Sequence, residues 1–157
     1  MDAIIPCLWF NGQAEEAARF YAALIPNSEV VSVNRAPADT PSGPAGSVLT
    51  VEFTLAGRPF LGLDGGPQFA FTEAVSFILP CESQAEVDRL WAALSEGGSP
   101  GPCGWLKDRY GLSWQVVPRE VMTMIKSEDR ARAGRVLQAL LGMSKIELEP
   151  LRQAWAA

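Results

Sequence analysis

The spacing of apolar residues changes several times along the chain, and each change marks the boundary of a predicted element. A short apolar run over residues 4–10, ended by Asn11-Gly12, predicts a first strand. Apolar residues then recur with helical spacing from Gln13 to Ile25, which predicts an amphipathic helix. Three further strands are expected at residues 29–35, 47–55 and 59–64. The segment 36–46 is rich in Pro, Gly and Ser and is expected to form an exposed, mobile loop.

The second half of the chain repeats this order. A strand is predicted at residues 74–81 and a helix at 84–94, with Gly97-Gly98 just past the helix end. Matching residues of the two helices are 70 positions apart: Arg19 and Arg89, Tyr21 and Trp91, Leu24 and Leu94. Because order and content repeat together, we interpret this as an internal duplication. The alternative is chance matching of Ala, Glu and Leu in two amphipathic helices.

The most informative stretch runs from Cys103 to Pro118. Asp108-Arg109-Tyr110-Gly111 is typical of a turn, so strands are expected on both sides of it. After the turn, one set of residues alternates with another, which places the two sets on opposite faces of a sheet: Leu112, Trp114 and Val116 against Ser113, Gln115 and Val117. Pro118 lacks the N–H that would continue the strand. We expect Lys107, Asp108 and Arg109 to be a solvated, charged turn.

The last part of the chain is helical by composition and spacing. Helices are predicted at residues 120–125, 128–141 and 148–156, and Gly142 suits a helix C-cap. An apolar stripe on this tail must cover either the outer face of the sheet or a second subunit, and the sequence leaves both open: Val136, Leu137, Leu140, Leu141 and Met143.

These elements predict an α+β fold. We expect one domain over residues 1–157, with module one at about 1–70, module two at about 71–118 and a helical tail at 119–157. Each module reads strand, helix, then two or three strands. A unit of about 60 residues buries too little surface to be stable alone, so the two sheets should pack side by side, or pair across a dimer, and leave a concave face.

Composition narrows the possible partners. Apolar residues make up 48% of the 157 residues and charged residues 20%, which is ordinary for a folded domain. The formal net charge of −5, without a basic patch, disfavours nucleic acid and anionic membranes as partners. The opening Met1-Asp2 lacks a basic signal-peptide region, so we expect a cytoplasmic protein. Three cysteines without a Cys-x-x-Cys pair indicate small apolar residues in or near strands rather than disulfides: Cys7, Cys81 and Cys103.

Several of these segments carry a family resemblance. The stretch 103–118, the opening 5–21, Ser76-Phe77 and the Gln-x-Glu-x-Asp pattern at 84–88 together resemble the PhnB-like family, whose domains are labelled 3-demethylubiquinone-9 3-methyltransferase. That family looks like a branch of the vicinal oxygen chelate superfamily, with glyoxalase I, extradiol dioxygenases and bleomycin-resistance proteins. The resemblance implies paired βαβββ modules of glyoxalase-like fold, a concave ligand-binding cavity and a homodimer. The helical tail, predicted above from composition and spacing, is then a C-terminal extension of this fold.

The resemblance also implies a divalent metal held by His and Glu side chains, but this chain has no histidine. The four ligand positions of the family fall on or beside Pro6, near Ser76, on Gln115 and within residues 61–63, where no carboxylate is present. We therefore predict no metal and no cofactor.

Five residues are candidates for ligand binding: Gln115, Ser76, Ser113, Trp105 and Pro6. The amide of Gln115 can orient a ligand oxygen or, equally, satisfy neighbouring groups inside the sheet. Ser76 and Ser113 have no histidine base that would make either a nucleophile, so structural roles are favoured for both. Trp105 follows Gly104 beside the turn and is expected to line a pocket. Trp114 should point away from the cavity if Gln115 points into it.

The predicted function is binding of a small organic molecule without turnover. The alternative is a metal-independent enzyme of the same superfamily, with Glu52, Asp64 or Tyr110 as acid or base. The sequence does not decide whether the protein is an enzyme. A third possibility is a dimeric structural protein whose cavity is filled by aromatic side chains. The methyltransferase label has no support in the sequence, because only Gly12 stands between the first strand and helix and no S-adenosylmethionine motif follows.

Overall fold

A computed structural model describes residues 4–157 and divides the chain into two compact units, one ending at Phe71 and the other running from Thr72 to Ala157. Met1-Asp2, on which the expectation of a missing signal peptide depends, lies outside the described residues.

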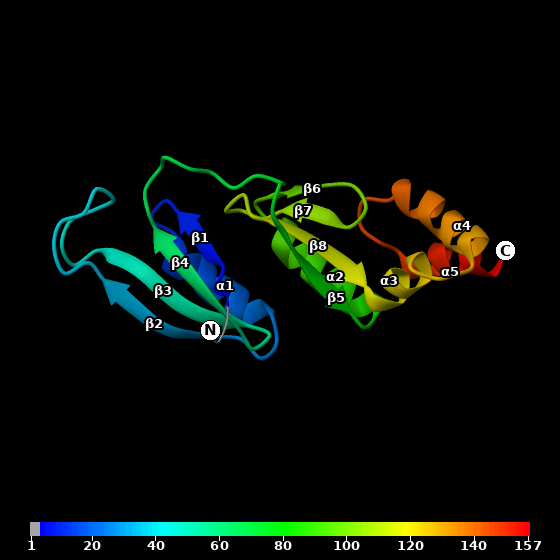
Figure 1. Ribbon diagram of the computed structural model, residues 1–157, viewed down its shortest axis with the longest axis horizontal. Coiled ribbons are helices and arrows are strands. Elements are labelled where there is room, and N and C mark those ends of the chain that lie inside the picture. Colours follow the sequence, from blue (N-terminus) through cyan, green and yellow to red (C-terminus); the bar gives the residue numbers. More distant parts are fainter. Residues whose placement is uncertain (1–3) are drawn as a thin grey trace. The chain divides into compact units, whose positions relative to one another are not determined.

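The first unit is a four-stranded sheet with one helix on one face (Figure 1). Its elements follow the predicted order: β1 (Cys7–Phe10), α1 (Ala14–Leu24), β2 (Glu29–Arg35), β3 (Val48–Leu55) and β4 (Arg58–Asp64). The strand order is β1-β4-β3-β2, with β1 parallel to β4 and the other pairs antiparallel. Helix α1 buries four small or aromatic residues against this sheet: Ala14, Ala17, Ala18 and Tyr21.

Strand β1 begins later than the apolar run predicted. Leu61 donates its backbone N–H to the carbonyl of Pro6 at 2.9 Å, and pairing goes no further toward the start of the chain. The next donor on β4 would be Pro59, which has no N–H. Strand β4 therefore cannot donate a backbone hydrogen bond to the carbonyl of Ile4. Ile4 and Ile5 are accordingly exposed. The loop 36–46 is mostly exposed, as predicted, except that Ala36 is buried and exchanges backbone hydrogen bonds with Gly46 and Ser47.

The second unit repeats the same topology. Its elements are β5 (Ser76–Cys81), α2 (Gln84–Ser95), β6 (Ser99–Pro100), β7 (Trp105–Lys107) and β8 (Ser113–Pro118). The order β5-β8-β7-β6 and the parallel pair β5–β8 match those of the first sheet. Gly97 adopts the left-handed conformation predicted after the helix, with φ of +73°. The α+β fold with paired βαβββ modules is thereby confirmed.

The C-terminal helical extension is confirmed as well. It comprises α3 (Arg119–Ile125), α4 (Arg130–Leu141) and α5 (Leu148–Ala156), with Gly142 as the C-cap of α4. The three helices enclose a small core of their own: Val121, Met124, Val136, Leu140, Ile146, Leu148 and Leu151. Half-buried Val117 of β8 and Cys103, in the turn before β7, pack against this core, so the tail covers the end of its own sheet. Leu137 and Leu141 of the predicted apolar stripe are exposed instead.

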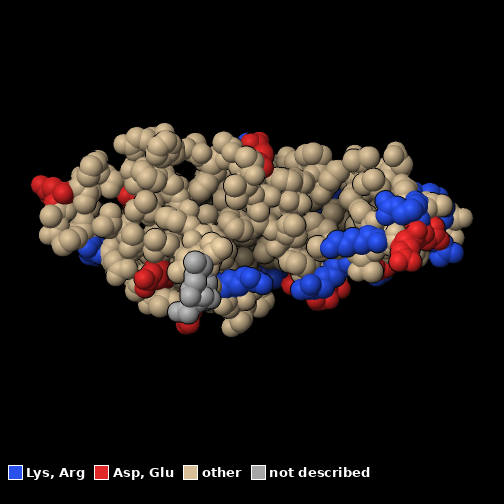
Figure 2. Space-filling model, in the orientation of Figure 1, with Lys and Arg blue, Asp and Glu red and all other residues tan. Residues whose placement is uncertain are grey.

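Charged residues of the tail gather in mixed clusters. Figure 2 shows Lys and Arg interspersed with Asp and Glu over the helices of the extension. Three ion pairs account for much of this mixing: Arg119–Glu82, Lys145–Asp88 and Arg152–Glu120. The cations of these pairs are therefore neutralised by carboxylates and do not form a basic patch. Within residues 4–157, no helix has the length and apolarity needed to span a bilayer.

Candidate functional site

The second sheet has one face toward helix α2 and an opposite face, here called the open face. Trp114 and Val116 of β8 point toward the helix and are buried, whereas Gln115 and Val117 alternate with them and are half-buried. Strand register places the following side chains together on the open face: Ser76 and Ile78 of β5, Trp105 and Lys107 of β7, and Ser113, Gln115 and Val117 of β8. Four of the five predicted site residues thus share one surface, and Trp114 points away from it.

A buried carboxylate sets this register. Asp108 Oδ1 accepts the backbone N–H groups of Tyr110 at 2.8 Å and Leu112 at 3.0 Å, and its Oδ2 accepts the indole N–H of Trp114 at 2.9 Å. The expectation that Asp108 belongs to a solvated turn is wrong, because the residue is only 3% exposed. Its hydrogen bonds to the strand direct Trp114 inward and therefore Ser113 and Gln115 outward.

Gln115 and Ser76 are directly bonded. The Nε2 of Gln115 donates to Ser76 Oγ at 2.9 Å, across the parallel pair of β5 and β8. This bond satisfies one donor of the amide inside the sheet. Gln115 also lines a cavity of about 300 Å³ between the open face and the helical tail, so both roles considered for it are compatible with its position.

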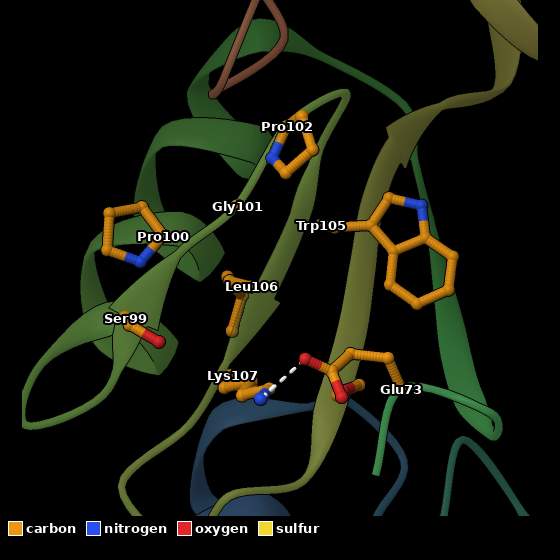
Figure 3. A pocket seen from close by; sticks show the side chains of 9 residues that line it. Glu73, Ser99, Pro100, Gly101, Pro102, Trp105, Leu106 and Lys107 are labelled. Atoms are coloured by element: carbon orange, nitrogen blue, oxygen red, sulfur yellow. Dashed lines mark ion pairs between the residues drawn. The ribbon is translucent and has the colours of Figure 1, made fainter.

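Trp105 lies opposite Gln115 in the register and lines two cavities. One is the 300 Å³ cavity that Gln115 lines. The other, here called the Trp105 cavity, has a volume of about 440 Å³. The residues that line it are Glu73, Ser99, Pro100, Gly101, Pro102, Trp105, Leu106, Lys107 and Ser113. Figure 3 shows the Trp105 indole pointing away from Pro100, on the side where Glu73 lies. The volume falls in the range of small-molecule pockets.

Ser113 is the most informative residue of the Trp105 cavity. It is 0% exposed, and its hydroxyl has no hydrogen-bond partner among the described residues. Leaving such a group buried without a partner costs about 1–3 kcal/mol. Because the hydroxyl has no solvent-accessible surface, a ligand in the cavity can hydrogen-bond to it, and so remove this cost, only when the side chains that cover it move.

Two charged residues at this cavity were missed by the sequence interpretation. Glu73 Oε1 and Lys107 Nζ form an ion pair at 2.5 Å (Figure 3). The hydrogen bond from Lys107 lowers the pKa of Glu73, so this carboxylate is ionised at neutral pH. Lys107 could have been found from its spacing, because it follows Trp105 by two positions and so shares its face. Glu73 lies outside any strand, and no pattern identified it.

The helical tail fixes the turn that carries one wall of the cavity. Cys103 and Gly104 donate their backbone N–H groups to the carbonyls of Met143 and Ser144, at 2.8 and 2.7 Å. The hydroxyl of Ser144 donates to the Gly101 carbonyl at 2.6 Å. Cys103 has a φ of +56° and Gly104 a φ of +82°, so two successive left-handed residues are held in place by these bonds.

The remaining candidates lie elsewhere. Pro6 precedes β1 in the first unit, and its carbonyl is engaged by Leu61. Glu52 is exposed and accepts a hydrogen bond from Ser32 Oγ at 2.7 Å, while Asp64 accepts the N–H of Ala14 at 2.9 Å and caps helix α1. Tyr110 lies in the β7–β8 turn. None of these four residues lines the Trp105 cavity.

The residues at the predicted metal-ligand positions do not fit a divalent cation of the glyoxalase type. Ser76 and Gln115 are neutral and hydrogen-bonded to each other, and the Pro6 side chain has no donor atom. In the part of the chain that the structure describes, no group of three or more His, Cys, Asp or Glu residues is arranged to hold a metal ion.

Comparison with known proteins places the chain among a set of similar folds. The family model described as 3-demethylubiquinone-9 3-methyltransferase matches residues 2–117. A PhnB protein from Bacillus cereus, named after the same methyltransferase, is 36% identical, with a TM-score of 0.66 over 74% of this chain and 99% of that one. A Pseudomonas aeruginosa protein is 23% identical, with a TM-score of 0.64 over 75% of this chain and 98% of that one, which shows a shared fold.

A glyoxylase/bleomycin resistance protein/dioxygenase domain from Frankia is more distant, at 16% identity and a TM-score of 0.46 over 75% of this chain and 92% of that one. The paired βαβββ topology is seen directly in this chain and does not depend on that likeness. No curated protein matches the sequence. The family model ends at residue 117, so the helical extension lies beyond it.

Proposed function

Because the chain belongs to the 3-demethylubiquinone-9 3-methyltransferase family, with its PhnB-type paired modules, we propose that it binds a small organic molecule in the Trp105 cavity without a metal ion. The carrying observation is the cavity itself, about 440 Å³ in volume, with the half-buried indole of Trp105 and the Lys107–Glu73 ion pair in its lining. The buried Ser113 hydroxyl, which has no hydrogen-bond partner among the described residues, would gain one from a ligand once the side chains that cover it move.

The shape and chemistry of the wall support an organic ligand with a flat ring. The indole of Trp105 is half-buried and offers an aromatic face, and Pro100 and Pro102 add rigid apolar surface. Ring stacking contributes about 0.5–1.5 kcal/mol beyond the burial of surface. The lining also contains four polar side chains, Glu73, Ser99, Lys107 and Ser113, and such groups orient a ligand that is bound mainly by apolar contact.

Catalysis by the residues named from sequence is not favoured by the geometry. Glu52, Asp64 and Tyr110 do not line the cavity, and Asp64 is engaged at the start of helix α1. Methyl transfer of the common S-adenosylmethionine type needs a parallel sheet with alternating strands and helices. Within residues 4–157 each sheet has only one parallel pair, so the family label does not supply a mechanism.

The test is a thermal-shift screen of a metabolite library, run on protein dialysed against EDTA. Compounds that stabilise the wild type should lose their effect with Trp105→Ala and keep it with Trp155→Ala, a matched loss of indole on helix α5, outside the cavity lining. Circular dichroism checks that both variants fold. Hits that survive Trp105→Ala, or that require added metal, would contradict the proposal, as would a screen without hits.

Further proposals concern the oligomeric state, the cellular location and the partners of the protein. We propose a homodimer, on the strength of the family resemblance and of large apolar side chains that are exposed on the described chain, such as Val31 and Ile78. We also propose a cytoplasmic location and no nucleic-acid or membrane partner, on the strength of the net charge of −5 and the paired cations of the tail. Sedimentation and localisation of a tagged chain would test them.

A further inference from the structure

We propose that the ligand of the Trp105 cavity carries a carboxylate, which displaces Glu73 from Lys107 when the ligand binds. This inference depends on the proposed function, since it specifies the chemical class of molecule for the same cavity. It assigns Glu73 the role of an internal substitute, a carboxylate of the chain that occupies the anion position while the cavity is empty.

The two partners of the ion pair are held very differently. Lys107 belongs to β7, where its backbone pairs with Ser99 on one side and Ser113 on the other. Glu73 lies in a turn before β5, outside the sheet, and its side chain is 61% exposed against 40% for Lys107. An exposed ion pair contributes little to stability, because water screens it and two long side chains lose freedom. Glu73 can therefore leave at small cost, while the ammonium group stays.

The position of Lys107 matches a ligand that rests on Trp105. The two residues are two positions apart on one strand and so lie on the same face, roughly 7 Å apart. Ser113 is directly opposite Lys107 in the register. A ring against the indole can thus direct a carboxylate to the ammonium group, and also to the unpartnered hydroxyl once the side chains that cover it have moved. Both groups donate hydrogen bonds to a carboxylate, and charge-assisted bonds of this kind are the strong ones.

A cationic ligand is disfavoured by the same geometry. Glu73 is the only carboxylate among the residues that line the described cavity, and it is held by its bond to Lys107 and by a hydrogen bond from its own backbone N–H. An ammonium group that paired with Glu73 would leave the Lys107 charge beside it without a partner. A neutral ligand would leave the ion pair intact and gain nothing from it.

The experiment is calorimetric titration with three probes of nearly equal shape: 2-naphthoate, its neutral counterpart 2-naphthamide, and the cation 2-naphthylmethylammonium. We expect 2-naphthoate to bind best. The variant Glu73→Gln should raise its affinity roughly two- to fivefold, the fold-change that corresponds to release of an exposed ion pair, and should leave 2-naphthamide unchanged. Lys107→Gln should reduce 2-naphthoate to the affinity of the amide. Glu96→Gln, which removes an exposed carboxylate outside the cavity lining, is the matched control and should change neither.

The outcomes separate this inference from the proposed function. Equal affinity for the three probes, tightest binding of the cation, or no gain with Glu73→Gln overturns the inference, and library hits that depend on Trp105 would still support the proposed function. Absence of binding by all three probes also overturns it. If the library screen gives no Trp105-dependent hit either, the proposed function fails as well.

Discussion

The indole Nε1 of Trp114 donates a hydrogen bond to Asp108 Oδ2 at 2.9 Å, and both groups are buried. The same carboxylate accepts two backbone N–H groups of the turn. Because successive residues of a strand point to opposite faces, fixing Trp114 toward helix α2 also fixes Ser113 toward the Trp105 cavity. One turn residue therefore determines which side chains the open face presents.

Replacing this carboxylate should destabilise the fold. Asp108→Asn can keep the two backbone bonds through its amide oxygen, but its NH₂ group then faces the indole N–H, two donors without an acceptor. We expect a loss of about 1–3 kcal/mol in the free energy of unfolding. Urea denaturation followed by circular dichroism measures this loss, with Glu96→Gln as a charge-matched control on the surface. An unfolding midpoint equal to that of the wild type would show that the Asp108–Trp114 bond contributes nothing.

Most of the fold could be predicted from periodicity, because the sheets are amphipathic and the turns carry Asn, Asp or Gly. The tail helix Leu148–Ala156 and the strand Glu29–Arg35 were predicted with their observed bounds. Strand β6 could not be predicted, since it has two residues and one is a proline. The start of β1 was misjudged because apolar content does not reveal that its neighbour presents Pro59, which has no N–H to donate.

The candidate site was predictable only in part. Strand alternation alone places Ser113 and Gln115 on one face, whereas the addition of Trp105 depends on the register between β7 and β8. The contribution of Glu73 depends on the path of an irregular segment, which no local pattern encodes. The prediction that Asp108 is solvated failed for a related reason. Its buried hydrogen-bond partner, the indole of Trp114, is six residues away in the sequence.

The unpartnered hydroxyl of Ser113 predicts an unusual mutational result. Ser113→Ala removes a buried group that makes no bond, so the ligand-free protein should gain roughly 1 kcal/mol of stability, while affinity for a library hit should fall. Ser76→Ala removes a hydroxyl that accepts a hydrogen bond from Gln115 and is the matched control, expected to show no such gain. Urea denaturation and calorimetric titration measure the two effects. Destabilisation by Ser113→Ala would mean that its hydroxyl has a structural partner.

A side chain of helix α2 holds the segment that leads into helix α5. Gln84 donates its side-chain N–H to the Ile146 carbonyl at 3.1 Å and accepts the backbone N–H of Leu148 at 2.8 Å. Its amide therefore binds one carbonyl and one N–H group of this segment. Gln84→Met should cost about 2 kcal/mol and speed hydrogen exchange at Leu148. Gln138→Met, on the exposed surface of α4, is the control. Unchanged exchange at Leu148 in Gln84→Met would contradict this role.

Alkaline pH should weaken the fold through Cys81. Burial, with smaller contributions from Glu86 and Glu82, raises the pKa of Cys81 to about 12. The unfolded thiol ionises near its ordinary pKa of about 8.5, so the stabilisation is complete below that pH and is lost as the pH rises toward 12.

The loss should approach about 1.4 kcal/mol for each pH unit above 9. Urea denaturation from pH 8 to 10.5 measures it as the difference between wild type and Cys81→Ala, in which other titrating groups cancel. The variant should be less stable at pH 8, because a cavity is created, and the gap should narrow as the pH rises. Parallel pH profiles would show that the native thiol ionises normally.

The most direct measurement is a crystal structure of the protein with a compound from the thermal-shift screen. The proposed function predicts ligand density against the Trp105 indole, with a polar ligand atom within hydrogen-bond distance of Ser113 Oγ. Density that lies only outside this cavity, with the Ser113 hydroxyl still lacking a ligand partner, would contradict the account.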